Sequence, residues 1–301
     1  DAPTSSRTEV QGITIEARKM THEAYRTAMD ELNKKLNATK SSGGYRFVYA
    51  DGKIEGINES RYFISLGDAD AMTDAERVIE AYKWDRGYQI KLQISASDAK
   101  NSTYFKDMPS VRDNPAMTDA PERTRRVVSM LGRIRGREDD DIPTEPGVCF
   151  IGGFLPGKAV DEEIFKGYFS FPGMHDAGFG LDTDTRIRET TTLLQRGASI
   201  NEMIKASDGQ TLRKGTVDLP GMQAEEWLTA GLTAAEVRGH YFVLEANSKI
   251  GSAKTPYVRL DMDNGARVEG DTLTQASLTE GEAVSVWDAV SRSLRPRPNA
   301  F

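Results

Sequence analysis

Cys149 is the residue of this chain with the clearest potential for chemistry. Gly152 and Gly153 follow it, and backbone N–H groups at such glycines can stabilise an oxyanion, so one hypothesis is a cysteine-dependent hydrolase. Its neighbours Val148 and Phe150 are apolar, however, and apolar surroundings disfavour the reactive thiolate. The pattern favours a buried cysteine in the first strand of a domain. As the only cysteine, Cys149 cannot form a disulfide within the chain.

The residue types that bind metal ions lack the spacing that a metal site requires. Neither HExxH nor CxxC occurs, and no two histidines are spaced as in a zinc site; they are His22, His175 and His240. Residues 261–265 resemble the start of a calcium loop, but the glycine comes one position early and Leu273 stands where such loops have glutamate. We expect a strand ending in an Asn-Gly turn there, and no metal or other cofactor.

Composition and charge are those of an ordinary globular protein. The chain has 301 residues, of which 38% are hydrophobic and 28% charged, enough for the cores of about two domains. Its net charge of -7 has the wrong sign for nucleic-acid binding, and no apolar run is long enough to span a membrane. No GxSxG elbow, phosphate loop or dinucleotide fingerprint occurs. We therefore expect a protein that is not an enzyme, binds no nucleic acid and does not insert into a membrane.

The first half of the chain is predicted to contain two helices and several strands. Thr21 is a good N-cap, and apolar residues recur at helical spacing from Tyr25 to a Ser-Gly turn at residues 41–44. A second helix with a basic end is expected over residues 120–137. Strands are expected at residues 45–49, 61–66, 78–84 and 88–95, and the last alternates apolar with polar residues.

A linker at residues 137–146, marked by three consecutive aspartates and two prolines, separates the second half. One long helix is expected there at residues 184–205. A last helix begins after Thr279, which forms a capping-box pattern with Glu282. Strands are expected at residues 148–154, 164–171, 177–182, 216–219, 225–229, 240–247 and 257–263.

Both halves share an order of helix, strands and a final helix with a basic end. Groups of strands without intervening helices disfavour a parallel sheet, although one large α/β domain is the alternative. We predict an α+β protein of two similar domains, residues 1–141 and 142–301. Each is expected to have a mainly antiparallel sheet with helices packed on one face.

Four stretches of the sequence stand out by their order along the chain. They are residues 142–150 after the Arg-rich helix, 212–217 running into 219–227, 242–246 before 257–260, and 287–290 through 293–298. In these stretches the chain resembles the immunity proteins that neutralise lipase effectors of the bacterial type VI secretion system. The resemblance covers chiefly the second half, and only the layout agrees in the first. One departure is that three residues separate Gly221 from Glu225, which form a glycine–glutamate pair in the family.

The resemblance implies a periplasmic protein whose partner is a cognate secreted phospholipase or lipase effector. Its two domains would grip the lid of the effector or cover its active site. The sequence begins with polar residues and lacks both a Met and a signal region, so we expect that a signal peptide or lipoprotein signal has been removed. A periplasmic scaffold or ligand-binding lipoprotein without a toxin partner is a further alternative.

Aromatic and methionine residues in loops are the candidates for contact with the effector, because such anchors dominate binding energy. The alternative for each one is that it completes the core of its own domain. The first domain offers Tyr104, Phe105 and Met108 in a long loop. The second offers residues on either side of Pro172 and Gly173, namely Phe171, Met174, His175 and Phe179.

Overall fold

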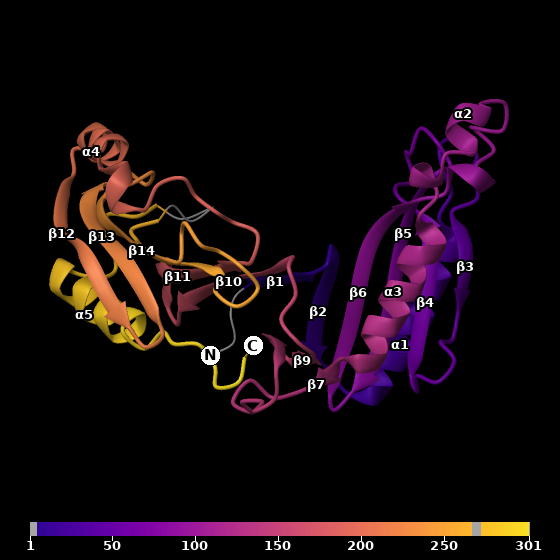
Figure 1. The fold of residues 1–301 in the computed structure, drawn as a ribbon, viewed down its shortest axis with the longest axis horizontal. Coiled ribbons are helices and arrows are strands. Elements are labelled where there is room, and N and C mark those ends of the chain that lie inside the picture. The colour runs from indigo at the N-terminus through magenta and orange to yellow at the C-terminus, as the bar shows by residue number, and fades with distance from the viewer. Residues whose placement is uncertain (1–4, 267–271, 301) are drawn as a thin grey trace. The chain divides into compact units, whose positions relative to one another are not determined.

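The computed structural model describes residues 5–266 and 272–300. Packing divides the chain into two compact units, drawn in Figure 1. The N-terminal unit comprises residues 12–143 and 147–157. The C-terminal unit comprises the described residues of 1–11, 144–146 and 158–301. The chain therefore passes from one unit to the other after residues 11, 143, 146 and 157. The predicted domain boundary after residue 141 stays a prediction.

The N-terminal unit is built on an antiparallel sheet with the strand order β2-β6-β5-β4-β3. In β6, Tyr88, Ile90, Leu92 and Ile94 are buried and the residues between them are partly exposed, so the predicted alternation is confirmed. The strands are β2 (Ile13–Lys19), β3 (Val48–Gly52), β4 (Ser60–Leu66), β5 (Glu76–Asp85) and β6 (Tyr88–Ser97).

Helix α1 (His22–Ala38) begins where the sequence predicts it, because the Thr21 side chain accepts a hydrogen bond from the backbone N–H of Ala24 at 3.2 Å. One face of the helix is apolar and lies on the sheet. Tyr25 packs there against Phe63 and Tyr82. A polar helix of this kind is held by tertiary packing rather than by its intrinsic propensity.

Helix α3 (Ala120–Arg133) lies on the opposite face of the same sheet, in front of β5 and β6 in Figure 1. Lys83, whose side chain points away from the face that holds Tyr82, donates a hydrogen bond to the carbonyl of Ile134 at the end of this helix. The helix is shorter than predicted, because Ile134 is buried in an extended conformation and the chain continues as a strand.

A small second sheet completes the N-terminal unit. It has the order β7-β9-β8, with β7 (Arg135–Gly136), β8 (Gly147–Phe150) and β9 (Gly153–Pro156). The sequence predicts one strand at residues 148–154, but the structure has a hairpin there. Gly152, with φ of 72°, adopts the left-handed conformation that reverses the chain. Cys149, predicted to be buried in the first strand of a domain, lies half-buried in β8 of this small sheet, opposite Phe154.

The C-terminal unit also has an antiparallel sheet, with the order β12-β13-β14-β15-β11-β10-β1. Strand β1, at the end of this order, comes from the N-terminal part of the chain and is paired with β10, with Ser5 opposite Tyr168 and Val10 opposite Glu163. The strands are β1 (Ser5–Val10), β10 (Glu163–Phe171), β11 (Met174–Asp184), β12 (Gln210–Leu219), β13 (Met222–Leu232), β14 (Arg238–Ala246) and β15 (Tyr257–Asn264).

The helices of the C-terminal unit cover opposite faces of this sheet. Helix α5 (Glu280–Ser291) has the predicted capping box between Thr279 and Glu282, and its Trp287 is fully buried among side chains that include Leu228. Helix α4 (Gly197–Ala206) packs through Ile200 and Ile204 against Trp227, the neighbour of Leu228 in β13. Adjacent strand residues point to opposite faces, so the two helices sandwich the sheet.

One predicted helix is much shorter in the structure. The sequence predicts a helix over residues 184–205. In the structure, a 3-10 turn η3 (Leu194–Arg196) leads into α4 (Gly197–Ala206). Asp184 still belongs to β11, and the segment before Leu193 is irregular. The long-range pairing of β11 with β15 decides the conformation at residue 184, and helical periodicity does not register such pairing.

The predicted α+β class with mainly antiparallel sheets is confirmed, and every described strand pair is antiparallel. The placement of the helices differs from the expectation, because each unit has helices on both faces of its sheet rather than on one. The physical reason is that both faces of the central strands carry large apolar side chains, as Trp227 and Leu228 illustrate.

Candidate partner-binding surfaces

A long loop, residues 98–119, leaves the sheet of the N-terminal unit between β6 and α3. Its two ends are tied together, because Asp98 and Thr118 form an isolated antiparallel bridge. The Asp119 carboxylate also accepts a hydrogen bond from the backbone N–H of Ser97 at 2.8 Å. The loop contains short helical turns, η1 (Ala99–Asn101), α2 (Pro109–Arg112) and η2 (Pro115–Met117); Figure 1 labels α2.

Asp74, which precedes β5, binds the start of this loop through hydrogen bonds to its carboxylate. Its carboxylate accepts hydrogen bonds from the hydroxyl of Ser102, from the backbone N–H and hydroxyl of Thr103, both at 2.7 Å, and from the backbone N–H of Tyr104 at 3.1 Å. The residue is 3% exposed. Burial acts to raise the pKa of Asp74, but these hydrogen bonds outweigh it and lower the pKa to about 2.

Arg77 supports the Asp74 segment. Its guanidinium donates hydrogen bonds to the carbonyls of Asp74 and Glu76, and its Cζ atom lies 3.4 Å from the centre of the Tyr49 ring. A buried arginine that stacks on an aromatic ring and donates to two carbonyls is a rigid support. The loop is thereby fixed before any partner arrives.

We expect Asp74→Asn to remove roughly 2 kcal/mol of stability at neutral pH, from the shift of the Asp74 pKa from 3.8 to about 2. A lowered pKa in the folded chain means that this stability is present above the unfolded pKa. It is lost as the pH falls from about 4 to about 2. Urea unfolding of both proteins should therefore give a difference that shrinks over this pH window. A difference that is the same at pH 5 and pH 2 contradicts the assignment.

The loop presents apolar side chains to solvent. Tyr104 and Met108 are each 46% exposed, and Met117, which the sequence analysis missed, is 37% exposed. Phe105 is half-buried, with its ring edge-on to Tyr104 at 5.0 Å between centroids. The structure thus brings Tyr104, Phe105 and Met108 together on one fixed loop, called here the apolar loop. Exposed apolar groups held in place by a buried network are typical of a binding surface.

The residues predicted in the C-terminal unit have mixed environments. Phe171 and Met174 are paired across the hairpin of β10 and β11, whose turn includes Gly173 with φ of 75°. Both are partly buried, and His175 is exposed. Phe179 is 6% exposed and stacks on Trp287, so its ring belongs to the core. Phe171 also packs against this core. Of the four residues, Met174 and His175 at the turn therefore remain as candidates for contact with a partner, and contact with an effector stays a prediction.

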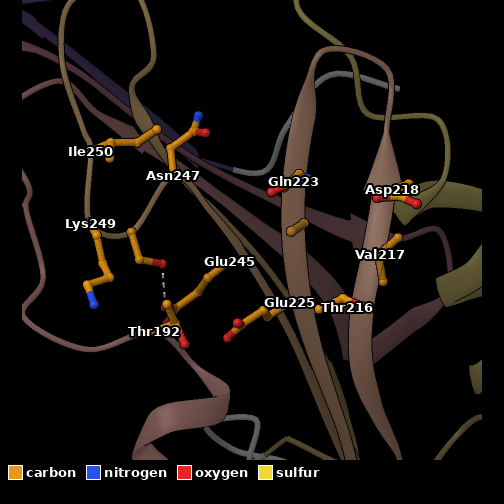
Figure 2. A pocket seen from close by; sticks show the side chains of 12 residues that line it. Thr192, Thr216, Val217, Asp218, Gln223, Glu225, Glu245, Asn247, Lys249 and Ile250 are labelled. Carbon is orange, nitrogen blue, oxygen red and sulfur yellow. Dashed lines mark hydrogen bonds between the residues drawn. The ribbon is translucent and has the colours of Figure 1, made fainter.

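Polar and apolar side chains together line a pocket of about 400 Å³ in the C-terminal unit, beside the hairpin of β12 and β13 (Figure 2). Figure 2 shows Glu225 pointing toward Glu245. Both carboxylates are already hydrogen-bonded: Glu225 accepts from the backbone N–H of Leu194 at 2.7 Å, and Glu245 accepts from Arg196 Nη2 at 2.6 and 2.7 Å. The pair therefore anchors the segment before α4, and it does not form an open acid–base pair.

The structure brings together no group of three or more histidine, cysteine or carboxylate side chains that could hold a metal ion, within the residues that it describes. His22 lies next to Glu59, with 2.8 Å between Nε2 and the carboxylate, and the ring of His240 is hydrogen-bonded to Asn264 at 2.8 Å. None of the helices in the described part of the chain has the length and apolar character needed to cross a membrane.

Family models match both parts of the chain. Residues 1–137 match the model of the N-terminal domain of Tle cognate immunity protein 4, and residues 141–299 match that of its C-terminal domain. No curated protein matches the chain.

Solved structures share the fold over nearly the whole chain. The chain is similar to a structure described as the Tle4-Tli4 complex, with 19% identity, a TM-score of 0.73 and coverage of 98% of this chain and 91% of that one. It is similar to the apo immunity protein TplEi of the type VI secretion system from Pseudomonas aeruginosa, with 20% identity, a TM-score of 0.72 and the same coverage. TplEi with a bound "L" peptide gives 20% identity, a TM-score of 0.67 and again 98% and 91% coverage.

Proposed function

Since the chain belongs to the family of Tle cognate immunity protein 4, we propose that it neutralises a phospholipase effector of the type VI secretion system by binding it and that it catalyses no reaction itself. The observation that carries this proposal, beyond family membership, is the apolar loop. The loop is fixed by the Asp74 network in the free chain and exposes Tyr104 and Met108. Binding to a rigid surface costs little ordering entropy.

The chemistry of the target supports an apolar contact. A lipase that acts on membranes exposes an apolar surface to reach its substrate, often by moving a lid. Tyr104 and Met108 would cover such a surface, and the exposed His175 at the turn of β10 and β11 would contact the same effector from the C-terminal unit. Holding the lid or covering the active site would stop hydrolysis without any chemistry by this chain.

The proposed place of action is the periplasm. The single cysteine is compatible with an oxidising compartment because it leaves no pair to oxidise within the chain. A phospholipase delivered there would attack the membranes of the cell, so its inhibitor must be present in the same compartment.

The experiment is a phospholipase assay of the effector encoded beside this chain, with and without an equimolar amount of the chain. We expect loss of activity and a stable complex on gel filtration. Full activity without a complex would sink the proposal. Cys149→Ala should inhibit as well as the wild-type chain. A hydrolase activity of the chain itself that this variant abolishes would instead support the cysteine-dependent hydrolase.

A further inference from the structure

The connection between β4 and β5, residues 67–75, exposes a methionine of the N-terminal unit. Met72 is 86% exposed, more than any other large apolar side chain of the described residues. It does not belong to the apolar loop. A single exposed apolar side chain is common at protein surfaces and by itself indicates nothing. The contacts around Met72 decide whether it can act as an anchor for a partner.

The backbone that carries Met72 is fixed by a neighbouring segment of the chain. The carbonyl of Met72 accepts a hydrogen bond from the hydroxyl of Tyr45 at 3.4 Å. The carbonyl of Ala69 accepts one from the backbone N–H of Ser42 at 2.9 Å. Ala71, which lies between the two, is 8% exposed, so its side chain is buried while that of Met72 is in solvent. Because this backbone is already ordered, binding through Met72 costs little ordering entropy.

The same connection is joined to the apolar loop. Asp74, two residues after Met72, accepts a hydrogen bond from the backbone N–H of Tyr104 at 3.1 Å. The backbone N–H of Asp98, at the start of the loop, donates to the carbonyl of Ala75 at 2.8 Å. The connection and the loop adjoin the start of β5 and the end of β6, which are paired in the sheet. Met72 and Tyr104 therefore stand on segments that leave the same end of the sheet.

The buried Arg77 strengthens this junction. Its Nη2 lies 3.6 Å from the carboxylate of Asp98, and its side chain is 1% exposed. Its Nη1 donates a hydrogen bond to the carbonyl of Asp74. One buried cation thus contacts both the connection and the loop. A partner would therefore meet Met72 and the apolar loop as parts of one preformed surface.

The charges beside Met72 indicate the kind of partner that fits. The connection contains three aspartates and neither lysine nor arginine. Two of them, Asp68 and Asp70, are exposed. In the apolar loop, by contrast, Lys106 and Arg112 each contact an adjacent aspartate. The negative charge beside Met72 is not compensated within the connection, so it favours a partner surface with basic side chains.

We propose that Met72 is a further anchor for the effector and that it inserts into an apolar pocket of the effector bordered by lysine or arginine side chains. This inference rests on the proposed function, because it extends the contact of the apolar loop to a second segment. The unbranched, polarisable side chain of methionine adapts to irregular pockets, and methionine is enriched in interfaces. Insertion into a membrane is disfavoured, because anionic lipids repel the carboxylates of Asp68 and Asp70.

The test is Met72→Asp, with the affinity for the purified effector measured by surface plasmon resonance. We expect the affinity to fall at least roughly tenfold, the effect of removing an interface anchor. Met72→Leu keeps an apolar side chain of similar volume and should bind within about twofold of the wild-type chain. Met203→Asp is the matched control, because Met203 is 72% exposed in the C-terminal unit, and it should bind normally. Unchanged affinity of Met72→Asp overturns the proposal, as does an equal loss in Met72→Leu or Met203→Asp.

The double variant Asp68→Asn and Asp70→Asn tests the charges. Asparagine keeps an oxygen acceptor at position 68 for the backbone N–H of Asp70, which Asp68 Oδ1 now accepts at 3.0 Å. At low ionic strength we expect association with the effector to be roughly three- to tenfold slower than for the wild-type chain. The difference should disappear at about 1 M salt, where charges are screened within about 3 Å. Equal association rates at low ionic strength overturn the basic border of the pocket.

Vesicles that contain phosphatidylglycerol test the membrane alternative. The wild-type chain should not bind them. Vesicle binding that Met72→Asp abolishes, with the affinity for the effector unaltered, overturns the proposal in favour of a lipid contact. If the wild-type chain itself fails to bind the effector, the proposed function fails, whereas normal wild-type binding that Met72→Asp leaves intact refutes only this anchor.

Discussion

Replacing Tyr104 and Met108 together by aspartate is expected to weaken effector binding by at least roughly 100-fold, because central aromatic and apolar anchors each contribute on the order of 2 kcal/mol. Both side chains are 46% exposed, so the fold should tolerate the change. Two carboxylates would also place uncompensated charge against an apolar partner surface. The dissociation constant can be measured by surface plasmon resonance, with the phospholipase assay as a second readout.

The matched control is the pair Met203→Asp and Leu232→Asp in the C-terminal unit. These side chains are 72% and 47% exposed and do not belong to the apolar loop. They should bind the effector as the wild-type chain does. If both double variants lose affinity equally, or if the loop variant retains it, the apolar loop is not the binding surface. Circular dichroism at equal concentrations checks that each variant is folded.

Glu226→Ala is expected to lower the free energy of unfolding by about 3–5 kcal/mol, the cost of breaking a buried charge network from one side. Glu226 accepts a hydrogen bond from Trp287 Nε1 at 3.0 Å. It also accepts from Arg292 at 2.9 and 3.0 Å and from Arg213 at 2.8 Å. Its side chain is 4% exposed, so the variant leaves the indole N–H buried without an acceptor and both cations short of a partner.

Urea unfolding measures this loss, and Asp288→Asn provides the comparison. Asp288 contacts the same two arginines, but its side chain is 40% exposed. Exposed ion pairs contribute about 0–1 kcal/mol, so this variant should cost far less. Equal losses for the two variants would show that burial does not set the strength of the network. Neither residue belongs to a proposed contact surface, so inhibition should persist in any folded fraction.

Local patterns explain which parts of the fold could be predicted. The N-caps Thr21 and Thr279 were predicted correctly because capping uses residues only three positions apart. The alternation of buried and partly exposed residues in β6 could be predicted for the same reason, because it is a pattern of neighbouring residues. The first strand β1 was missed, since its sequence is polar and it is defined by pairing with β10, more than half the chain away.

The predicted contact residues show where sequence reasoning stops. A loop with aromatic and methionine residues could be recognised at positions 104–108. The similar set around Phe171 and Phe179 could not be divided into exposed and buried members. The side chain of Phe179 is in the core because Trp287 packs on it from a helix over a hundred residues later. No local pattern contains that contact.

The α+β class, the capped helix ends and the resemblance to type VI immunity proteins could be predicted from the amino-acid sequence, because each depends on periodicity, local hydrogen bonds or the order of short motifs. The folded chain was needed to see that Asp74 fixes the apolar loop and that the Tyr25 hydroxyl lacks an acceptor among the described residues. Hydrogen-bond satisfaction and burial depend on which distant segments the sheet register places side by side. Asp74 and Tyr104 are 30 positions apart and meet only because their segments adjoin β5 and β6, which pair in the sheet.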